Sequence, residues 1–336
     1  MGEVVGEVLV TGGAGYIGSH IVRRLVETGR TVVVIDNLSE GSEKALPGEV
    51  ELVRSDFADR ARLDELFGKR EIRHVIHMAA LALVGDSVSD PATYYRQNVV
   101  GSLALLEAAR EHQVEGIVFS STAATYGNPV SLPIDEEHPT RPTNPYGETK
   151  LAFERALSWY RNAYGLRYVA LRYFNAAGAH PDGDIGEFRR RETHLIPRLL
   201  RGILAGEETV VPIFGTDYPT TDGTCVRDYV HVVDLAEAHV HALRALEQGG
   251  MEGESFNLGN GEGFSVREVV DMVGKVTGRR PKTEDAPRRA GDPPILVASA
   301  ARARERLGWQ PRLPTLGEIV QTAWKWHESH PRGYES

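Results

Sequence analysis

Two residues four positions apart carry the most chemistry in this sequence. Tyr146 and Lys150 belong to the segment Pro145-Tyr146-Gly147-Glu148-Thr149-Lys150, and this spacing places both side chains on one face of a helix, one turn apart. A phenol is a poor acid near neutral pH, because its ordinary pKa is about 10. A buried ammonium group beside it favours the phenolate. We therefore expect Lys150 to lower the pKa of Tyr146 and to make it an acid/base group.

A glycine-rich turn predicts the second reactant. Gly12, Gly15 and Gly18 lie between a predicted strand at 8–10 and a helix that begins at Ser19. Such glycines permit a tight turn and let the backbone approach a pyrophosphate at the N-terminus of the helix. Asp36 ends the next predicted strand, where a carboxylate accepts from both ribose hydroxyls and repels a 2′-phosphate. The pattern indicates NAD rather than NADP, and a base beside a nicotinamide indicates hydride chemistry at an alcohol carbon.

A third polar group is expected near the same edge of the sheet. Thr122 follows the predicted strand 117–121, and ligands of doubly wound sheets bind at the carboxyl ends of the strands. Lowering the pKa of Tyr146 to about 7 requires roughly 4 kcal/mol. One cation at about 5 Å, at an effective dielectric constant near 20, supplies roughly 3 kcal/mol. A positively charged nicotinamide ring can supply the rest.

Composition and charge exclude several other functions. The 336 residues include 41% apolar and 25% charged residues, and the net charge is −9, which disfavours nucleic-acid binding because that requires a basic surface. No apolar run approaches the roughly 20 residues that span a bilayer. Cys225 is the only cysteine, which fits a reducing compartment. We expect a cytoplasmic protein that does not bind nucleic acid or membrane. No His or Cys spacing indicates a metal site.

The elements that must hold these residues follow an α/β pattern. Short apolar runs alternate with helical segments up to about residue 174, which is typical of a parallel sheet with crossover helices. Beyond that point Gly, Pro and Asp become frequent. The sequence predicts a doubly wound parallel sheet of the Rossmann type and a smaller C-terminal α/β lobe. We assign residues 1–174 to the NAD-binding domain, with a return of about 228–247, and residues 175–336 to a substrate lobe.

On these motifs the chain resembles the extended short-chain dehydrogenase/reductases and, within them, the UDP-galactose 4-epimerases. The resemblance covers nearly the whole chain. It includes the segments Thr11–His20, Asp36–Leu38, Val84–Ser87, Leu171–Asn175, Ile213–Thr220, Val226–Val232, Asn257–Gly259 and Pro287–Asp292. The segment Asp217–Thr224 that leads into Arg227 is especially specific, because it lies outside the half of the chain that binds the cofactor.

The resemblance implies roles for individual residues. Tyr146 would move the proton of the sugar O4, Lys150 would lower its pKa and hold the nicotinamide ribose, and Thr122 would hydrogen bond to O4. The residues expected at NAD are Gly12, Gly15, Tyr16, Ile17, Gly18, Asp36, Asn37, Asp56, Phe57, Met78, Ala79, Asn98, Tyr146, Lys150 and Tyr173. Those expected at UDP-glucose or UDP-galactose are Thr122, Tyr146, Asn175, His194, Leu195, Phe214, Arg227, Arg289, Asp292 and Leu296. The helices at 95–110 and 151–160 would form a homodimer.

Three positions depart from the family pattern. Met78 replaces an aromatic residue. Ala82 stands where many members have a cofactor-facing Lys, so one bond to NAD is absent and its retention is weaker. Leu296 stands where members with narrow specificity have Tyr and broader ones have Ser or Cys. The implied activity is inversion at C4 of a UDP-hexose through a transient 4-keto sugar.

Three alternatives remain open at this stage. A UDP-N-acetylhexosamine 4-epimerase would use the same residues. A 4,6-dehydratase or a UDP-glucuronate decarboxylase is disfavoured, because such relatives carry acidic residues after the Thr, where this chain has Ala123 and Ala124. A regulatory protein that has lost turnover would be expected to lack Tyr146 or Lys150, and both are present. The basic run Arg189-Arg190-Arg191 reads as a solvated surface that could also clamp phosphate.

Overall fold

The protein is built around one parallel sheet, seen in a computed structural model that describes residues 6–206, 209–289 and 292–335. Within these residues seven strands form the sheet, and every neighbouring pair is parallel. In spatial order the strands are β10 (Gly253–Leu258), β6 (Arg167–Tyr173), β5 (Gly116–Thr122), β4 (Ile72–His77), β1 (Glu7–Thr11), β2 (Val32–Asp36) and β3 (Glu51–Arg54). The order reverses at β1, so the sheet is doubly wound, as the sequence predicts.

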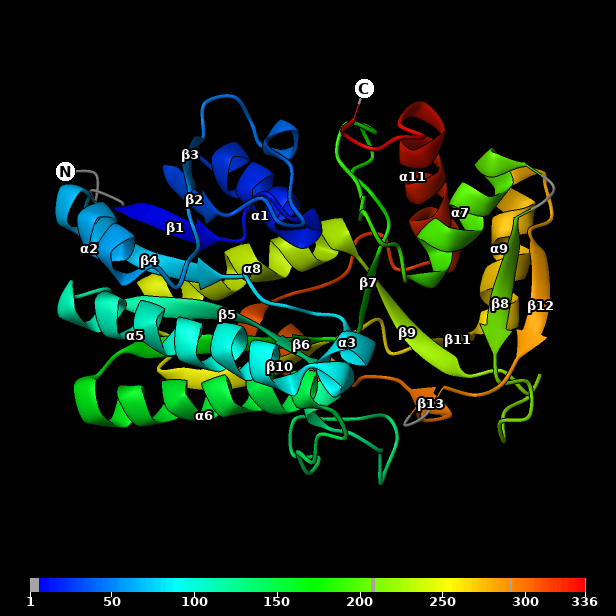
Figure 1. Ribbon diagram of the computed structural model, residues 1–336. Coiled ribbons are helices and arrows are strands. Elements are labelled where there is room, and N and C mark those ends of the chain that lie inside the picture. The colour runs from blue at the N-terminus through cyan, green and yellow to red at the C-terminus, as the bar shows by residue number, and fades with distance from the viewer. Residues whose placement is uncertain (1–5, 207–208, 290–291, 336) are drawn as a thin grey trace.

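Helices cover both faces of this sheet (Figure 1). One face is covered by α1 (Tyr16–Glu27), α8 (Val232–Glu247) and α10 (Ala301–Leu307). The other is covered by α2 (Arg60–Lys69), α5 (Ser102–Glu111) and α6 (Pro145–Tyr164). Because both faces are covered, the inner strands are mostly apolar, and β2 is buried at every position.

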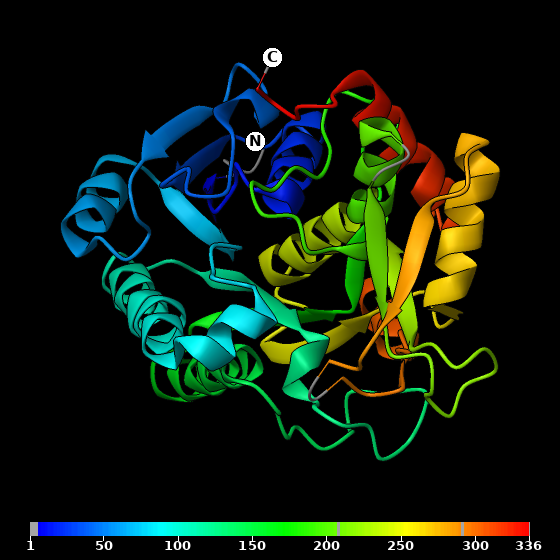
Figure 2. The same cartoon turned by 45° about the vertical axis from the view of Figure 1, so that its right-hand side comes forward.

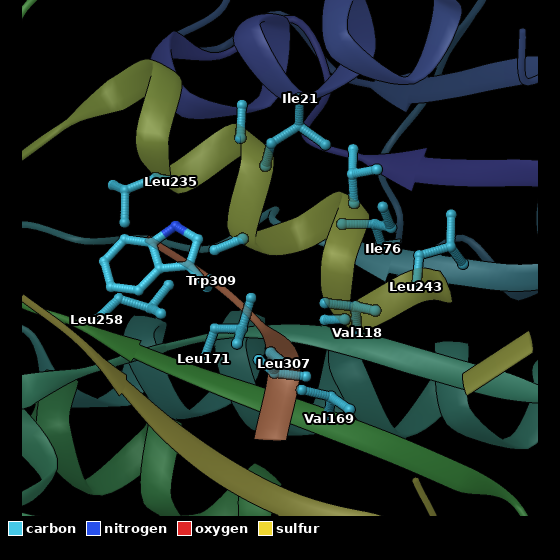
Figure 3. Packing of buried hydrophobic residues seen from close by; sticks show 14 of the residues in the cluster. Ile21, Ile76, Val118, Val169, Leu171, Leu235, Leu243, Leu258, Leu307 and Trp309 are labelled. Carbon is cyan, nitrogen blue, oxygen red and sulfur yellow. The ribbon is translucent and has the colours of Figure 1, made fainter. Parts of the chain in front are cut away.

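The core on the α1 and α8 face joins distant parts of the chain (Figure 3). Ile21 of α1 and Leu235 and Leu243 of α8 pack over Ile76 and other sheet residues. Trp309, just after α10, is fully buried there. Its indole nitrogen donates to the carbonyl of Asp234 over 2.8 Å, so the large ring is buried without an unpaired N–H group.

The smaller lobe lies beside the carboxyl end of the sheet (Figure 2). Among the described residues it has a four-stranded sheet of β7 (Asn175–Ala177), β9 (Val226–His231), β11 (Gly263–Ser265) and β13 (Ile295–Leu296), and a pair of β8 (Val210–Phe214) and β12 (Lys282–Ala286). The helices α7 (Leu195–Ala205), α9 (Val266–Thr277) and α11 (Leu316–Ser329) pack together in a separate core. This lobe therefore provides a second rigid wall.

The chain passes between the two lobes more than once. After β9 it returns to the main sheet through α8 and β10, leaves for β11 to β13, and returns again through α10. Residues 228–247, expected to return, include α8, and the return extends through β10 and Trp309. The division at residue 174 stays a prediction, since it assigns one boundary to an interleaved chain.

Local structure differs from expectation in one long helical segment. The sequence predicts a single helix from Pro91 to His112. The structure has α4 (Pro91–Tyr94), a π-helical stretch η2 (Tyr95–Gly101) and then α5. A π-helical turn has i→i+5 hydrogen bonds, which the spacing of apolar residues in the sequence does not reveal. Such turns often occur at functional sites. Here it contains Asn98. None of the described helices is long and apolar enough to cross a membrane.

Candidate active site

The glycine turn between β1 and α1 has no room for side chains at two of its three positions. A Cβ on Gly12, which has φ +69°, would lie 2.7 Å from the amide nitrogen of Ala79, and a Cβ on Gly18 would lie 2.2 Å from the carbonyl oxygen of Gly12. Gly15 begins α1 without a side-chain cap. The backbone amides of the first turn are thus available to an anion, which also benefits from the helix dipole.

Asp36 ends β2 next to this turn. Its carboxylate accepts from the amide of Ala14 at 3.0 Å and from the amide of Leu38 at 2.8 Å. Burial raises the pKa of Asp36, and the two amide bonds oppose this rise. The carboxylate is therefore held in one orientation by the glycine turn itself. Each oxygen retains further acceptor capacity, which suits a pair of ribose hydroxyls.

The carboxylate of Asp56 at the cofactor edge also binds a residue that sequence reasoning missed. Asn37 donates to the carboxylate of Asp56 over 3.3 Å, and Gln97 of η2 donates to both of its oxygens over 3.0 Å. The ring of Phe57 is buried in the core, 5.1 Å from the ring of His77. Phe57 thus has only its backbone to offer to an adenine. No local motif distinguishes Gln97, because its role depends on the π-helical stretch.

Asn98 holds the loop after β4. Its side-chain oxygen accepts from the amide of Leu81 and its nitrogen donates to the Leu81 carbonyl, both over 2.9 Å. It also donates to the hydroxyl of Thr149 over 3.2 Å. In the same loop the amides of Met78 and Ala79 donate to the Thr11 hydroxyl. Asn98 therefore ties this loop to α6, near the predicted catalytic residues.

Tyr146 and Thr122 are brought together by the start of α6. Asn144 caps this helix by accepting from the amide of Gly147 over 2.9 Å, and Pro145 occupies the first turn. A Cβ on Gly147 would lie 2.5 Å from the carbonyl oxygen of Ala124, so the helix and the segment after β5 approach as closely as glycine allows. The Thr122 hydroxyl, which accepts from the amide of Ala124 over 3.1 Å, acts on the phenol of Tyr146 and opposes the rise of its pKa.

Lys150 donates a hydrogen bond to the sheet, a contact that the sequence did not predict. Its ammonium group is buried and donates to the carbonyl of Ser120 over 2.8 Å, and it lies 4.9 Å from the centre of the Phe119 ring. Burial lowers the pKa of Lys150 to about 7. The hydroxyl of Ser120 in turn bonds to that of Tyr173. The Lys150 side chain is thereby held against β5, near Tyr173, which is one of the residues expected at NAD.

Two groups outside the helix of Tyr146 act on its phenol. Burial raises the pKa of Tyr146, and the Thr122 hydroxyl and the guanidinium of Arg189 oppose the rise. Sequence reasoning overlooked Arg189 as a neighbour of this site, since it lies more than 40 residues along the chain and within a basic run. That Lys150 also lowers the pKa of Tyr146 stays a prediction.

The predicted UDP-sugar residues line the smaller lobe. Arg227 on β9 forms an ion pair with Asp292 at 3.4 Å and also donates to the Pro293 carbonyl. The guanidinium of Arg289 lies 4.1 Å from the centre of the Phe214 ring. Leu296 pairs in register with Arg227 on the neighbouring strand β9. Two residues of the family segment here, 290 and 291, lie outside the described residues.

Three more predicted residues make their contacts within the smaller lobe. Asn175 donates to the carbonyl of Asp228 over 2.9 Å. His194 and Leu195 begin α7, and the imidazole Nδ1 of His194 lies 2.7 Å from a carboxylate oxygen of Glu187. Glu187 is a second residue that sequence reasoning missed, because no pattern marks it.

Tyr16 and Ile17 occupy the first turn of α1. The hydroxyl of Tyr16 donates to the carbonyl of Gly178 over 2.7 Å, which joins the glycine turn to the smaller lobe, while Ile17 packs against the core. Of the basic run, only part is solvated as predicted: Arg190 and Arg191 are exposed, whereas Arg189 is partly buried and pairs with Glu187 at 3.1 Å.

Two groups of potential metal ligands occur among the described residues. They are His180, Asp182 and Asp184, and Glu187, Glu192 and His194. Arginines already neutralise both groups, since Arg23 pairs with Asp182 and Asp184, and Arg189 and Arg201 pair with Glu187 and Glu192. Neither group is assigned to a metal here.

The residues present fit a dinucleotide. The glycine turn offers amide donors at the N-terminus of α1, and Asp36 offers acceptors that are fixed in orientation. Lys150 bonds to the Ser120 carbonyl and Tyr173 to the Ser120 hydroxyl, near the carboxyl end of β5. A cavity of about 140 Å³ adjoins the turn, lined in part by Ala14, Gly15 and Tyr16. Fold and site together define an α/β protein with a dinucleotide turn at the edge of its sheet and a partly buried tyrosine at the start of α6.

Comparison with known proteins places the chain within that class. Residues 8–259 match the NAD dependent epimerase/dehydratase family, and the chain belongs to this family. It is 54% identical to a UDP-glucose 4-epimerase of Halalkalibacterium halodurans over 98% of both chains. The crystal structure of UDP-glucose 4-epimerase from Brucella ovis in complex with NAD is 48% identical, with a TM-score of 0.92, over 95% of this chain and 98% of that chain.

A more distant structure is similar over the same extent. That of UDP-glucose 4-epimerase from Bifidobacterium longum, in complex with NAD⁺ and UDP, has a TM-score of 0.91 at 38% identity and covers 98% of this chain and 100% of that chain. The similarity thus extends over both lobes. The fold class and the family expected from the sequence are confirmed.

Proposed function

We propose that this protein interconverts UDP-glucose and UDP-galactose by inverting the configuration at C4. The observation that carries the proposal is the meeting of α6 and the end of β5, where Thr122 acts on the phenol of Tyr146 and Lys150 donates to the Ser120 carbonyl. The same chain has a dinucleotide turn, and its smaller lobe carries Arg227 and Arg289, guanidinium groups suited to a diphosphate.

The chain's own residues supply the proton chemistry. Tyr146 takes the proton of the O4 hydroxyl when the alcohol is oxidised and returns it when the ketone is reduced. Thr122 hydrogen bonds to the same oxygen and orients it. General acid/base groups of this kind contribute about 10²–10⁴-fold to a rate. When bound, NAD supplies reversible acceptance of the hydride from C4. Gly12, Asp36 and Lys150 are the residues that would hold it.

Inversion requires that the 4-keto sugar turn over while the nucleotide stays bound. Arg227 and Arg289 are placed to hold the diphosphate, Asp292 can accept from the uridine ribose, and Phe214 can pack near uracil. The sugar then pivots about its diphosphate link between the two lobes. Domain 1–174 with its return segments would hold the cofactor, and residues 175–336 would hold the nucleotide sugar.

The alternatives within the family differ in support. Ala123 and Ala124 follow Thr122 and cannot transfer protons, so elimination of water across C5 and C6 is disfavoured. A UDP-N-acetylhexosamine 4-epimerase would keep every residue named above, and Leu296 is the side chain expected to decide how well an N-acetyl group is accepted.

The working form is proposed to be a cytoplasmic homodimer. The helices η2, α5 and α6 lie along one side of the molecule (Figure 1) and expose the large apolar side chains of Tyr95, Val100, Trp159 and Tyr164. Exposed apolar patches of this kind mark interfaces. Cys225 is buried and free, which suits a reducing compartment.

The test is incubation of the purified protein with UDP-galactose, first without added NAD and then with it. We expect UDP-glucose to form and to reach the same ratio from either sugar. Turnover without added NAD indicates a retained cofactor. Formation of a 4-keto-6-deoxy sugar or release of CO₂ from UDP-glucuronate would instead assign the chain to another activity of the family.

A further inference from the structure

One buried carboxylate in the smaller lobe holds two cations at once. A single oxygen of Glu187 lies 2.7 Å from Nδ1 of His194 and 3.1 Å from Nε of Arg189. The Glu187 side chain is only 3% exposed. Such a carboxylate costs free energy to bury unless it is paired, so the two cations and Glu187 stabilise one another.

The backbone around Glu187 is fixed by the neighbouring helices. A Cβ on Gly186 would lie 2.3 Å from the ring of Trp326 on α11, and the indole nitrogen of Trp326 donates to the Glu187 carbonyl over 3.2 Å. Arg201 of α7 donates to the carbonyl of Arg189 over 3.1 Å. The carboxylate is therefore held in place rather than free to follow solvent.

His194 is arranged to present its other edge outward. Its Nδ1 is engaged by the buried carboxylate, yet its side chain is 42% exposed, so the exposed part is the edge that carries Nε2. The residue also begins α7, and its amide donates to Glu192 over 2.9 Å. With Nδ1–H donating to Glu187, a second proton on Nε2 makes His194 a cationic donor.

Two arginines extend this positive charge. Arg198 lies four residues after His194 in α7, on the same face of the helix, and the charge of Arg289 acts on it. Arg289 itself stacks on Phe214 at 4.1 Å. In the described part of the chain, no side-chain hydrogen bond or ion pair joins Arg198 or Arg289 to a carboxylate within 4 Å. Uncompensated cations that repel each other indicate a site for a polyanion.

Resting on the proposed function, we propose that Glu187 is a positioning residue that keeps His194 doubly protonated, so that His194 joins Arg198 and Arg289 in binding the diphosphate of the UDP-sugar. Arg227 is partly compensated by Asp292 at 3.4 Å, which makes the additional charge of His194 useful. Glu187 does not touch the substrate and acts through His194.

The charges around His194 favour this protonation state. The Glu187 carboxylate is the largest influence and raises the pKa of His194, and Glu192 acts in the same direction. Burial and the guanidinium of Arg189 oppose them. Arg201 of α7 pairs with Glu192 at 3.6 Å, and His327 of α11 and Tyr16 of α1 lie within the electrostatic influence of Glu187. Without Glu187, the groups that remain mostly disfavour the imidazolium.

The test measures the dissociation constant of UDP-glucose between pH 6 and 9 by calorimetry. The background is the NAD-loaded Tyr146→Phe protein, in which turnover is expected to fall by about 10²–10⁴-fold. UDP-glucose is preferred to UDP, because a terminal phosphate itself titrates near pH 6. The variants are Glu187→Gln, His194→Asn and the two combined. Asp182→Asn, an exposed acid in the same loop that pairs with Arg23, serves as the control.

We expect Glu187→Gln to bind UDP-glucose about as well as its background at pH 6 and about tenfold more weakly at pH 8, while uridine binding stays unchanged. His194→Asn should bind more weakly at every pH, and Glu187→Gln should add nothing in its presence. Melting temperatures show whether each variant is folded, and His194→Asn keeps the pair of Glu187 and Arg189. Parallel pH profiles for Glu187→Gln and its background would overturn the inference. Failure of wild type to bind UDP-glucose at any pH would instead overturn the proposed function.

Discussion

Lys150 on α6 donates to the carbonyl of Ser120 on β5, with 2.8 Å between nitrogen and oxygen. This bond anchors the ammonium group to the sheet rather than to Tyr146. A lysine buried here loses hydration, and its pKa falls to about 7. The protonated form of Lys150 therefore lowers the free energy of unfolding when NAD and substrate are absent.

Replacement of Lys150 by Met is therefore expected to change the pH dependence of stability. The pKa of Lys150 is about 7 in the folded state and 10.5 in the unfolded state, so the unfolded state binds more protons between these values. The free energy of unfolding of wild type should rise from pH 7 to pH 10, relative to Lys150→Met, by roughly 3–5 kcal/mol. Urea titrations of NAD-free protein measure the difference. A constant difference across this range would contradict the lowered pKa.

Tyr146→Phe is expected to lower kcat by about 10²–10⁴-fold, because only the proton-transfer group is removed. NAD content should stay unchanged, as should the melting temperature within a few degrees. Initial rates with UDP-galactose and chromatography of the released cofactor provide the measurements. Tyr164→Phe, at an exposed position of the same helix, is the matched control. Activity of Tyr146→Phe within tenfold of wild type would remove Tyr146 from its proposed role.

Asp36→Asn is expected to weaken NAD binding and to reduce the preference of the protein for NAD over NADP. The side-chain NH₂ of Asn would face one of the two backbone amides from which Asp36 now accepts a hydrogen bond. A buried donor left without a partner costs about 1–3 kcal/mol. The loss of negative charge also removes the repulsion of a 2′-phosphate. Competition binding of NAD and NADP to NAD-stripped protein measures both effects. An unchanged ratio of the two affinities would show that another residue selects the cofactor.

Leu296 is expected to set the tolerance for N-acetylated sugars. It lies on β13 beside Arg227, and a few misfit atoms in an apolar wall cost about 1–3 kcal/mol, or roughly 10–200-fold in kcat/KM. UDP-galactose should therefore be preferred to UDP-N-acetylgalactosamine in wild type. Leu296→Ser should narrow the kcat/KM ratio and Leu296→Tyr should widen it. If neither change moves the ratio, specificity must lie in the segment 176–191.

Trp159→Glu is expected to convert a dimer into a monomer. The Trp159 side chain belongs to the exposed apolar residues of α6 and is 72% exposed in the single chain. A buried, unpaired carboxylate in an interface is strongly unfavourable. Light scattering at micromolar concentration measures the change, with Arg304→Glu, exposed on α10 outside the predicted interface, as the control. A monomeric wild type would reject the dimer itself.

Much of the cofactor site could be predicted, because its signals are local. The glycines of the turn between β1 and α1, Asp36 at the end of β2 and the spacing of Tyr146 and Lys150 each depend on a few neighbouring residues. Periodicity identifies the strands for the same reason. The π-helical stretch at Asn98 could not be predicted, since its extra residue per turn leaves the apolar pattern almost unchanged.

The roles that depend on distant contacts were decided only by the tertiary structure. Sequence spacing pairs Lys150 with Tyr146, and only the packing of α6 on β5 reveals that the Lys150 ammonium donates to the Ser120 carbonyl. Arg189 read as part of a solvated run, yet Glu187 draws it into the smaller lobe near the phenol. The sequence by itself determined which chemical groups are present and which local turns hold them. Tertiary structure decided which groups are buried together, and burial with long-range pairing is what sets their charge.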